Sequence, residues 1–436
     1  RIYEEMCAGL AVCAREHTRE LDGIAVDTWG VDFGLVARDG SVLANPVHYR
    51  DRRNDGMMDE AFKAVPREEL YRETGIQFLP FNTVYQLLSL VKSGSPLLEV
   101  ADSLLMMGDL LAYLLSGKKA CEYTNASTTQ LLDPHTRTWN EGLITRLGLP
   151  RRLLLDPVAP GTVLGPLRED VAAAAGLAQG IPVIATASHD TGSAVAAVPV
   201  GGDGAPWAYL SSGTWSLLGA ETDAPVVNDQ SAALDFTNEG GVGGKIRLLK
   251  NIFGLWLVQE CRRSWERAGQ TADYATLTAE AAAAEPFRSV LKNIDDPRLM
   301  APPDMAALIR EMCAEDGQPV PETRGQVVRC ALESLALKYR RTLRALDGLL
   351  GRRTEVLHII GGGTQNKLLN QMTADACGVR VVTGPVEATA LGNIGVQAMA
   401  AGAVGSLAEM RRIIADSIEL EQYAPKDTAA WDRLDA

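Results

Sequence analysis

Residues 184–195 contain the polar step around which we interpret the rest of the chain. An apolar run ends there in Ser-His-Asp-Thr at residues 188–191, and small residues follow. This order predicts a buried strand that stops, exposes one carboxylate, that of Asp190, and enters a helix. An Asp at a helix entrance more often serves only as an N-cap, so the role of Asp190 depends on its companions elsewhere in the chain.

Three glycine-bearing turns follow that step, at residues 210–216, 359–366 and 384–395. In the first, small residues let backbone N–H groups approach an anion and Thr214 adds a hydroxyl donor, although an ordinary hairpin turn has the same pattern. The second places three glycines between a buried strand and a helix, where an open α/β sheet binds a nucleotide. A flexible connection is the alternative there, but consecutive glycines cost ordering entropy. The third turn predicts a small-residue helix that packs closely on a neighbour or on a bound ring.

The elements that must position these turns alternate between strands and helices. We expect strands at 182–186, 207–210, 215–218, 356–360 and 379–382, and helices at 252–267, 325–350, 365–376 and 390–401. Upstream we expect an amphipathic helix at 2–17, a hairpin that turns at Asp39-Gly40, and a mainly helical segment at 57–153. This alternation predicts α/β layers, and the Pro-, Gly- and Ala-rich stretch at 157–180 predicts the boundary between two lobes.

Composition narrows the class of protein. The chain has 436 residues, 46% of them hydrophobic, which is too long for one ordinary domain. Its 42 basic and 55 acidic residues give a net charge of −13, which argues against a partner among nucleic acids or anionic membranes. No run is long and apolar enough to span a membrane, and no signal peptide opens the chain. These features predict a soluble cytoplasmic protein.

The sequence predicts no metal site made by the chain alone. Its seven cysteines form no CxxC pair and its five histidines show no HxxxH spacing. Any metal would therefore arrive with a ligand. There is also no GxxxxGK[ST] loop, no HRD or DFG set and no GxSxG elbow, so neither a P-loop enzyme nor a protein kinase is indicated.

Read together, the motifs resemble the FGGY carbohydrate kinases, and within that family the enzymes that act on L-rhamnulose. The resemblance extends over essentially the whole chain. It is carried by DTWGVDF at 27–33, YRD at 49–51, GIQFLPFNT at 75–83, EYTNA at 122–126, SHDT at 188–191, LSSGTWS at 210–216, TNEGG at 237–241, LKNI at 249–252, GGG at 361–363 and GPVE at 384–387.

The resemblance implies a fold and a division into lobes. The fold is a two-lobed, actin-like ATPase (ribonuclease H-like) fold of the α/β class with an interdomain cleft. The implied domains are an N-terminal sugar-binding lobe at 1–186, a C-terminal nucleotide-binding lobe at 187–424 and a tail at 425–436. A monomer or a homodimer is expected.

The resemblance also implies a reaction and its residues. The expected reaction is ATP-dependent phosphorylation of L-rhamnulose to L-rhamnulose 1-phosphate with Mg²⁺, in L-rhamnose catabolism. Asp190 matches the catalytic base, which takes the proton of the attacking sugar hydroxyl. The positions that match sugar contacts are Gly30, His189, Asp190, Thr191 and Asn251. Those that match ATP contacts are Thr214, Gln259 and Gly362.

One expected element is missing. Family members open with a strand-turn-strand carrying D-x-G-x-S/T, whose amides hold the ATP phosphates, and no stretch here matches it. We therefore expect the first lobe to be N-terminally truncated, with Arg1 falling beyond that element. The alternatives are a kinase of a related deoxyketose such as L-fuculose, a non-catalytic sugar-binding protein if the motif is truly absent and, as the weakest, a chaperone-like ATPase. Cys313 and Cys330 match a cysteine pair of related sequences, although a reducing cytosol favours two thiols.

Overall fold

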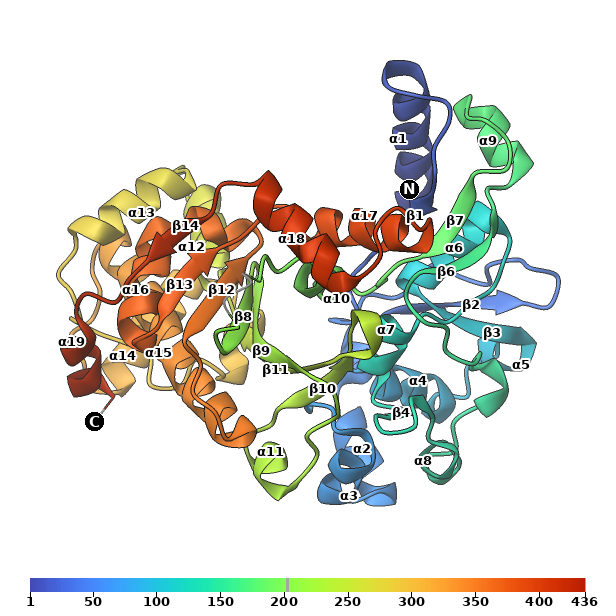
Figure 1. Cartoon of the computed structure of the whole chain (residues 1–436). Coiled ribbons are helices and arrows are strands. Elements are labelled where there is room, and N and C mark those ends of the chain that lie inside the picture. The colour runs from blue at the N-terminus through green and yellow to red at the C-terminus, as the bar shows by residue number, and fades with distance from the viewer. Residues whose placement is uncertain (201–203, 436) are drawn as a thin grey trace. The chain divides into compact units, whose positions relative to one another are not determined.

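The chain folds into two compact units in the computed structural model, which describes residues 1–200 and 204–435. Each unit is assembled from separate stretches of the sequence, so the chain passes between the units several times (Figure 1). Unit 1 comprises Arg1–Ala197, Glu221–Leu248 and Thr389–Ile413, and unit 2 comprises Val198–Ala220, Leu249–Ala388 and Ile414–Ala436.

Unit 1 contains a small sheet in the order β1-β7-β6, in which β1 (Ile24–Ala25) runs parallel to β7 (Pro182–Ala185) and β6 (Thr162–Pro166) runs antiparallel to β7. Helix α1 (Ile2–Glu16) packs near α9 (Glu169–Ala175). Met6 and Leu10 of α1 contact the core beneath it, which includes Ile24 and Val183. The apolar stripe predicted for residues 2–17 is therefore only partly covered: Met6, Leu10 and Cys13 are half-buried, whereas Ile2 is 49% exposed.

A second pair of strands in unit 1 carries the predicted hairpin. β2 (Phe33–Ala37) turns at residues 38–40 and forms an isolated antiparallel bridge between Val36 and Val42. Its long partner comes from elsewhere in the chain, because β2 pairs antiparallel with β3 (Ala101–Met106). The hairpin prediction is confirmed, but the principal pairing is non-local.

The segment predicted as mainly helical contributes most of one hydrophobic core of unit 1, around residues such as Leu70, Tyr85 and Leu131. Besides β3 it contains only two-residue strands, β4 (Leu132–Asp133) and β5 (Thr138–Trp139). Its helices are α2 (Met57–Ala64), α3 (Arg67–Thr74), α4 (Thr83–Lys92), α5 (Leu97–Val100), α6 (Met107–Ser116), α7 (Tyr123–Ala126) and α8 (Glu141–Arg146).

Later stretches of the chain complete unit 1. The short helix α10 (Asp190–Ala196) follows β7, and Glu221–Leu248 contributes α11 (Asp229–Ala233) and β10 (Thr237–Gly240). Most of α17 (Ala388–Ala400) and the start of α18 (Leu407–Ser417) also belong here. A Cβ on Gly392 of α17 would overlap the carbonyl oxygen of Ser193, so α17 packs directly against α10. The close helix packing predicted for the third glycine turn is confirmed, with a neighbouring helix as the partner.

Unit 2 is built on a sheet in the order β9-β8-β12-β13-β14. β12 runs parallel to both β8 and β13, whereas β9 runs antiparallel to β8 and β14 runs antiparallel to β13. Figure 1 shows these strands with α15 and α16 packed beside them. The strands are β8 (Trp207–Ser212), β9 (Trp215–Thr222), β12 (Val356–Ile360), β13 (Arg380–Thr383) and β14 (Glu421–Tyr423), and the helices are α12 (Trp256–Arg267), α13 (Tyr274–Ala283), α14 (Met305–Glu315), α15 (Arg324–Leu350), α16 (Lys367–Cys377) and α19 (Thr428–Leu434).

The predicted α/β alternation is confirmed, with one element corrected. We predicted that the helix containing Gln259 begins at residue 252. In the structure β11 (Ile246–Phe253) continues through Ile252 and Phe253, and α12 begins at Trp256. β11 is bonded within the sheet next to β9, and this non-local pairing outweighs the local helical pattern.

Candidate active site

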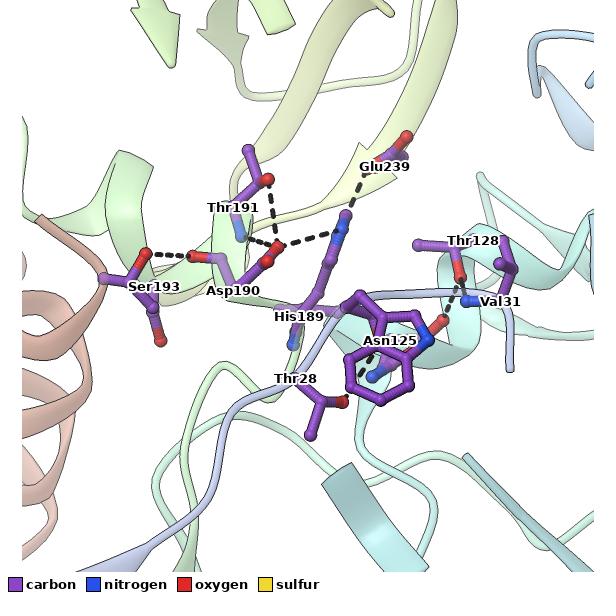
Figure 2. Close-up of polar contacts among 12 residues, drawn as sticks. Thr28, Val31, Asn125, Thr128, His189, Asp190, Thr191, Ser193 and Glu239 are labelled. Carbon is purple, nitrogen blue, oxygen red and sulfur yellow. Dashed lines mark hydrogen bonds and ion pairs between the residues drawn. The ribbon is translucent and has the colours of Figure 1, made fainter. Parts of the chain in front are cut away.

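The polar step after β7 lies at the start of α10. His189 occupies the N-cap position and Asp190 is the first residue of the helix, so Asp190 is not the N-cap. Its Oδ1 accepts hydrogen bonds from the backbone N–H of Thr191 at 2.6 Å and from the Thr191 hydroxyl at 3.2 Å (Figure 2). The Asp190 side chain is 46% exposed. The structure therefore presents a carboxylate that is oriented by its neighbour and open to a ligand.

The backbone around Thr28 holds this step in place. The N–H of Thr28 donates to the carbonyl of Ser188 at 2.8 Å, and the N–H of Asp190 donates to the carbonyl of Thr28 at 2.8 Å. A Cβ built on Gly30 would lie 3.4 Å from Nε2 of His189. Two motifs that are far apart in the sequence, DTWG and SHDT, are thus bonded side by side. Four of the predicted sugar-binding residues, Gly30, His189, Asp190 and Thr191, come together in unit 1.

A buried carboxylate, that of Glu122, ties the step to α7. Its oxygens accept from the N–H and hydroxyl of Thr124 at 2.8 and 2.5 Å, and from the N–H of Asn125 at 3.2 Å. They also accept from the N–H and hydroxyl of Ser188 at 3.0 and 2.7 Å. Five donors on one fully enclosed carboxylate fix the backbone two residues before Asp190.

A second buried carboxylate, that of Asp109, lies beside Glu122 and accepts the Glu122 N–H at 3.0 Å. Burial raises the pKa of Asp109 well above its usual value, and the charge of Glu122 raises it further. Burial also raises the pKa of Glu122, against the opposing effect of its Thr124 and Ser188 donors. The polar network beneath the step therefore contains two carboxyl groups whose ionised forms are disfavoured by the protein interior.

His189 has charged neighbours on two sides. Its Nε2 lies 3.6 Å from Oδ1 of Asp190, and its Nδ1 lies 3.4 Å from Oε2 of Glu239 (Figure 2). The same Nδ1 lies 3.0 Å from Nη2 of Arg247. Burial alone raises the pKa of Glu239, but Arg247 and His189 together outweigh burial and hold this pKa below its usual value. Glu239 is therefore an ionised partner of Arg247, with an Nη2–Oε2 distance of 3.1 Å.

A cavity of about 690 Å³ opens beside Asp190 within unit 1. Its polar lining includes Asp27, Thr28, Asp190, Thr389 and Asn393, and its remaining lining is largely apolar. Asn393 donates to Oδ2 of Asp27 at 2.5 Å. Burial raises the pKa of Asp27 and the charge of Asp190 adds to the rise, whereas the Asn393 bond opposes it. The volume is in the range of small-molecule sites, and two carboxylates line it.

The predicted nucleotide residues lie in unit 2. Thr214, in the turn between β8 and β9, donates to Oε1 of Gln259 at 3.2 Å, so these two predicted ATP contacts are neighbours. Gly362 lies in the turn that follows β12, and a Cβ there would meet nothing within 4 Å. A Cβ on Gly363 would instead overlap the hydroxyl of Ser212 at the end of β8. Asn251, predicted to contact the sugar, lies on the part of β11 that belongs to unit 2.

Comparison with known proteins identifies the family. Residues 2–197 match the N-terminal domain of the FGGY family of carbohydrate kinases, and residues 208–401 match its C-terminal domain. The chain belongs to the FGGY family of carbohydrate kinases. It is therefore an enzyme that transfers a phosphoryl group to a carbohydrate, and ATP is the phosphoryl donor implied by the kinase family.

Among the relatives of this FGGY kinase is a rhamnulokinase from Bacteroides thetaiotaomicron, 49% identical over 431 residues, which covers 99% of this chain and 87% of the relative. A rhamnulokinase from Pectobacterium carotovorum is 47% identical over 421 residues, and the aligned region covers 95% of this chain and 82% of that relative.

Solved structures of the family establish the fold of this FGGY kinase as the two-domain, actin-like α/β fold. Gluconate kinase from Lactobacillus acidophilus aligns with a TM-score of 0.80 at 17% identity, covering 99% of this chain and 86% of that one. Plasmodium falciparum glycerol kinase with ADP aligns with a TM-score of 0.74 at 17% identity, again covering 99% and 86%. At such identities the likeness concerns the fold alone.

Sequence reasoning missed the residues that support this kinase's polar step from below. Asp109, Glu122, Glu239 and Arg247 are all buried in unit 1. The available signal was a charged residue within an apolar or small-residue run, as in EYTNA and TNEGG. Charged residues are rarely buried unless they are paired, so such runs identify candidates, but not their partners.

Across residues 1–200 and 204–435 no helix has the length and apolar character needed to cross a membrane. The same described residues contain no cluster of three or more His, Cys, Asp or Glu suited to a metal ion. The Sγ atoms of Cys313 and Cys330 are 3.8 Å apart, and all seven cysteines are free thiols.

Proposed function

We propose that this FGGY kinase transfers the γ-phosphoryl group of ATP to L-rhamnulose and forms L-rhamnulose 1-phosphate, as a step in L-rhamnose catabolism. The observation that carries the proposal is the 49% and 47% identity to two rhamnulokinases over 99% and 95% of the chain. The identity spans both matched family domains. It therefore includes residues on the sugar side and on the nucleotide side of the proposed reaction.

Asp190 is the proposed general base. Its Oδ1 is engaged by Thr191, and its side chain is half exposed at the wall of the cavity. In the proposed reaction a carboxylate oxygen of Asp190 accepts the proton of the sugar hydroxyl. The oxygen of that hydroxyl bonds to the γ-phosphorus as the bond from this phosphorus to the leaving oxygen of ADP breaks. Proton acceptance by a positioned group contributes about 10²- to 10⁴-fold to such rates.

Sugar contacts are proposed for Gly30, His189, Thr191 and Asn251, and ATP contacts for Thr214, Gln259 and Gly362. A Cβ on Gly30 would lie 3.1 Å from the side chain of Thr128 and 3.4 Å from Nε2 of His189, so glycine avoids a tight contact with Thr128 beside the His189 ring. The hydrogen bond between Thr214 and Gln259 supports a shared role for these two residues.

Mg²⁺ is the proposed metal, entering with ATP. Asp27 and Asp190 offer oxygen ligands of the kind Mg²⁺ prefers. Burial raises the pKa of Asp27 and the charge of Asp190 adds to the rise, as expected where a cation would be favourable. Mg²⁺ supplies neutralisation of phosphate charge in reactions of this class. We also propose a cytoplasmic site of action, where ATP is available and the free thiols of the chain stay reduced.

A substrate panel tests the proposal. Purified protein is mixed with Mg²⁺ and ATP, and ADP release is measured with L-rhamnulose, L-fuculose, D-xylulose, gluconate and glycerol. We expect L-rhamnulose to give the highest kcat/KM by at least tenfold. A higher value with L-fuculose would support a kinase of a related deoxyketose instead. Sugar binding measured by calorimetry, with no ATP binding and no ADP release, would contradict the kinase assignment of this polypeptide.

A further inference from the structure

Arg247 is a fully buried cation with an incomplete set of partners. Its side chain is 0% exposed on β11. Nε donates to the carbonyl of Gly240 at 2.8 Å, and Nη2 contacts Glu239 and His189. Nη1 has no hydrogen-bond partner within the described part of the chain. Burying a guanidinium costs free energy unless it is paired, so a specific task for its charge and donors is expected here.

The chemistry of the guanidinium constrains the ring of His189. Arg has N–H donors and no acceptor, so the 3.0 Å contact from Nη2 requires Nδ1 of His189 to be the acceptor. The proton of the neutral ring then resides on Nε2. Glu239 would require the opposite tautomer. Its Oε2 lies 3.4 Å from the same Nδ1 and can only accept a hydrogen bond, so Nδ1 would have to carry the proton. The two arrangements exclude each other, and the shorter contact is the one with Arg247.

The chosen tautomer decides what His189 offers to the catalytic side. Nε2 lies 3.6 Å from Oδ1 of Asp190 (Figure 2). It also lies beside Gly30, 3.4 Å from where a Cβ on that residue would stand. With the proton on Nε2, the ring presents a donor to Asp190 or to an oxygen of the bound sugar. With the proton on Nδ1, it would present a lone pair to the Asp190 carboxylate, and two acceptors facing each other repel.

We infer that Arg247, paired with Glu239, is a positioning residue that holds His189 in the Nε2–H tautomer, so that His189 acts as a hydrogen-bond donor to the sugar beside Asp190. The inference rests on the proposed sugar-binding role of His189. Charge balance with Glu239 does not by itself explain why a cation is buried here, because two neutral residues could fill the same space without the cost of desolvating two charges. The positioning role gives the charge and the donors of Arg247 a specific task.

The tautomer can be read directly. Long-range ¹H–¹⁵N spectra of the histidine-labelled 436-residue protein distinguish Nε2–H from Nδ1–H, and His189→Gln assigns one of only five histidine signals. We expect Nε2–H in the wild type. Arg247→Met, which removes the donor but keeps an apolar stem, is expected to move the proton to Nδ1, where it bonds to Glu239. Glu239→Gln keeps Arg247 and is expected to keep Nε2–H. An Nδ1–H signal in the wild type, or a change of tautomer in Glu239→Gln but not in Arg247→Met, would overturn the inference.

Kinetics supply an independent readout. For Arg247→Met we expect kcat/KM for L-rhamnulose to fall about 10- to 100-fold, with KM for ATP changed less than twofold, because the lost donor faces the sugar. Arg247→Lys retains a donor and a charge and is expected to recover part of the loss. If Arg247→Met weakened the kinetic parameters for L-rhamnulose and for ATP to the same extent, Arg247 would have only a structural role and the inference would be contradicted.

The outcome does not depend on whether every variant folds. If Arg247→Met does not fold, the wild-type and Glu239→Gln spectra still decide between the two tautomers. The spectra also do not depend on turnover. A wild type that shows Nε2–H but gives no ADP release with any sugar would refute the proposed function alone, whereas an active wild type with Nδ1–H would refute the positioning role alone.

Discussion

The polar step of unit 1 and the glycine turns of unit 2 position their groups in opposite ways. Around residues 188–191 the structure relies on side chains, since Glu122 alone accepts five hydrogen bonds. Around residues 361–364 it relies on the absence of side chains, since Gly361 adopts φ 87° and Gly363 leaves no room for a Cβ against Ser212.

Each region is therefore vulnerable to a different kind of change. A carboxylate network fails when a charge or an acceptor is removed, even if the shape is kept. A backbone turn is indifferent to charge and fails when volume is added. The following predictions test this contrast, beginning with the largest expected effect.

Asp190→Asn keeps the shape of the proposed base but removes its ability to accept a proton. We expect kcat to fall by about 10²- to 10⁴-fold, while the dissociation constant for the sugar, measured by calorimetry, changes only a few-fold. Asp59→Asn, on an exposed position of α2, serves as the control and should retain full activity. Substantial turnover by Asp190→Asn would exclude Asp190 as the base.

Glu122→Gln tests whether charge supports the polar step from below. The amide nitrogen of Gln would face the donors of Ser188 or Thr124, and each unsatisfied buried donor costs about 1–3 kcal/mol. We expect the free energy of unfolding in urea to fall by roughly 3 kcal/mol, with a lower kcat in the protein that remains folded. Glu99→Gln, at an exposed position, should change this free energy by less than about 0.5 kcal/mol. Equal stability of the two variants would mean that the carboxylate is not needed.

Gly363→Ala tests the opposite principle in unit 2. The added Cβ would overlap the hydroxyl of Ser212, so we expect a loss of about 1–3 kcal/mol in the free energy of unfolding and weaker ATP binding. Gly362→Ala is the matched control, because its Cβ would meet nothing within 4 Å, and its stability should change by less than about 1 kcal/mol. If the two alanine variants lose the same stability, steric exclusion is not what positions this turn.

The smallest effect concerns pH. The raised pKa of Asp109, caused first by burial and then by the charge of Glu122, means that the folded protein keeps this proton longer than the unfolded chain. The stability linked to Asp109 is present below the unfolded pKa of about 3.9 and is lost as pH rises toward the folded pKa. Asp109→Asn should therefore show a less negative slope of unfolding free energy against pH than the wild type, measured by urea titrations upward from about pH 4.

Asp102→Asn provides the control with the opposite sign. Its hydrogen bond with Lys119 lowers the pKa of Asp102, so any stability it contributes is present above the unfolded pKa and is lost as pH falls. Removing it should make the slope more negative, or leave it unchanged because the pair is exposed to solvent. Parallel curves for Asp109→Asn and the wild type would contradict the assignment of a retained proton to Asp109.

Local patterns in the sequence determined most of the elements. α15 begins at a capping box formed by Thr323 and Gln326 and ends at Gly351 in the left-handed region, signals that are complete within the helix itself. The strand and helix alternation from 356 to 400, the start of α10 near Asp190 and the close packing of the 388–400 helix were predictable for the same reason. Each depends on residues a few positions apart.

Tertiary structure alone decided the partners. The assignment of Ile252 and Phe253 to β11 follows from the pairing of β11 with β9. The bonds from Thr124 and Asn125 to Glu122 are local, but the two bonds from Ser188 to Glu122 and the contact of Arg247 with His189 join residues more than fifty positions apart in the chain. The hydrophobic period of a sequence specifies which face of an element is buried, but it cannot specify which polar group will meet a buried carboxylate or ring nitrogen. That choice is made when the elements pack, because a buried charge is stable only where the fold brings its partner within hydrogen-bond distance.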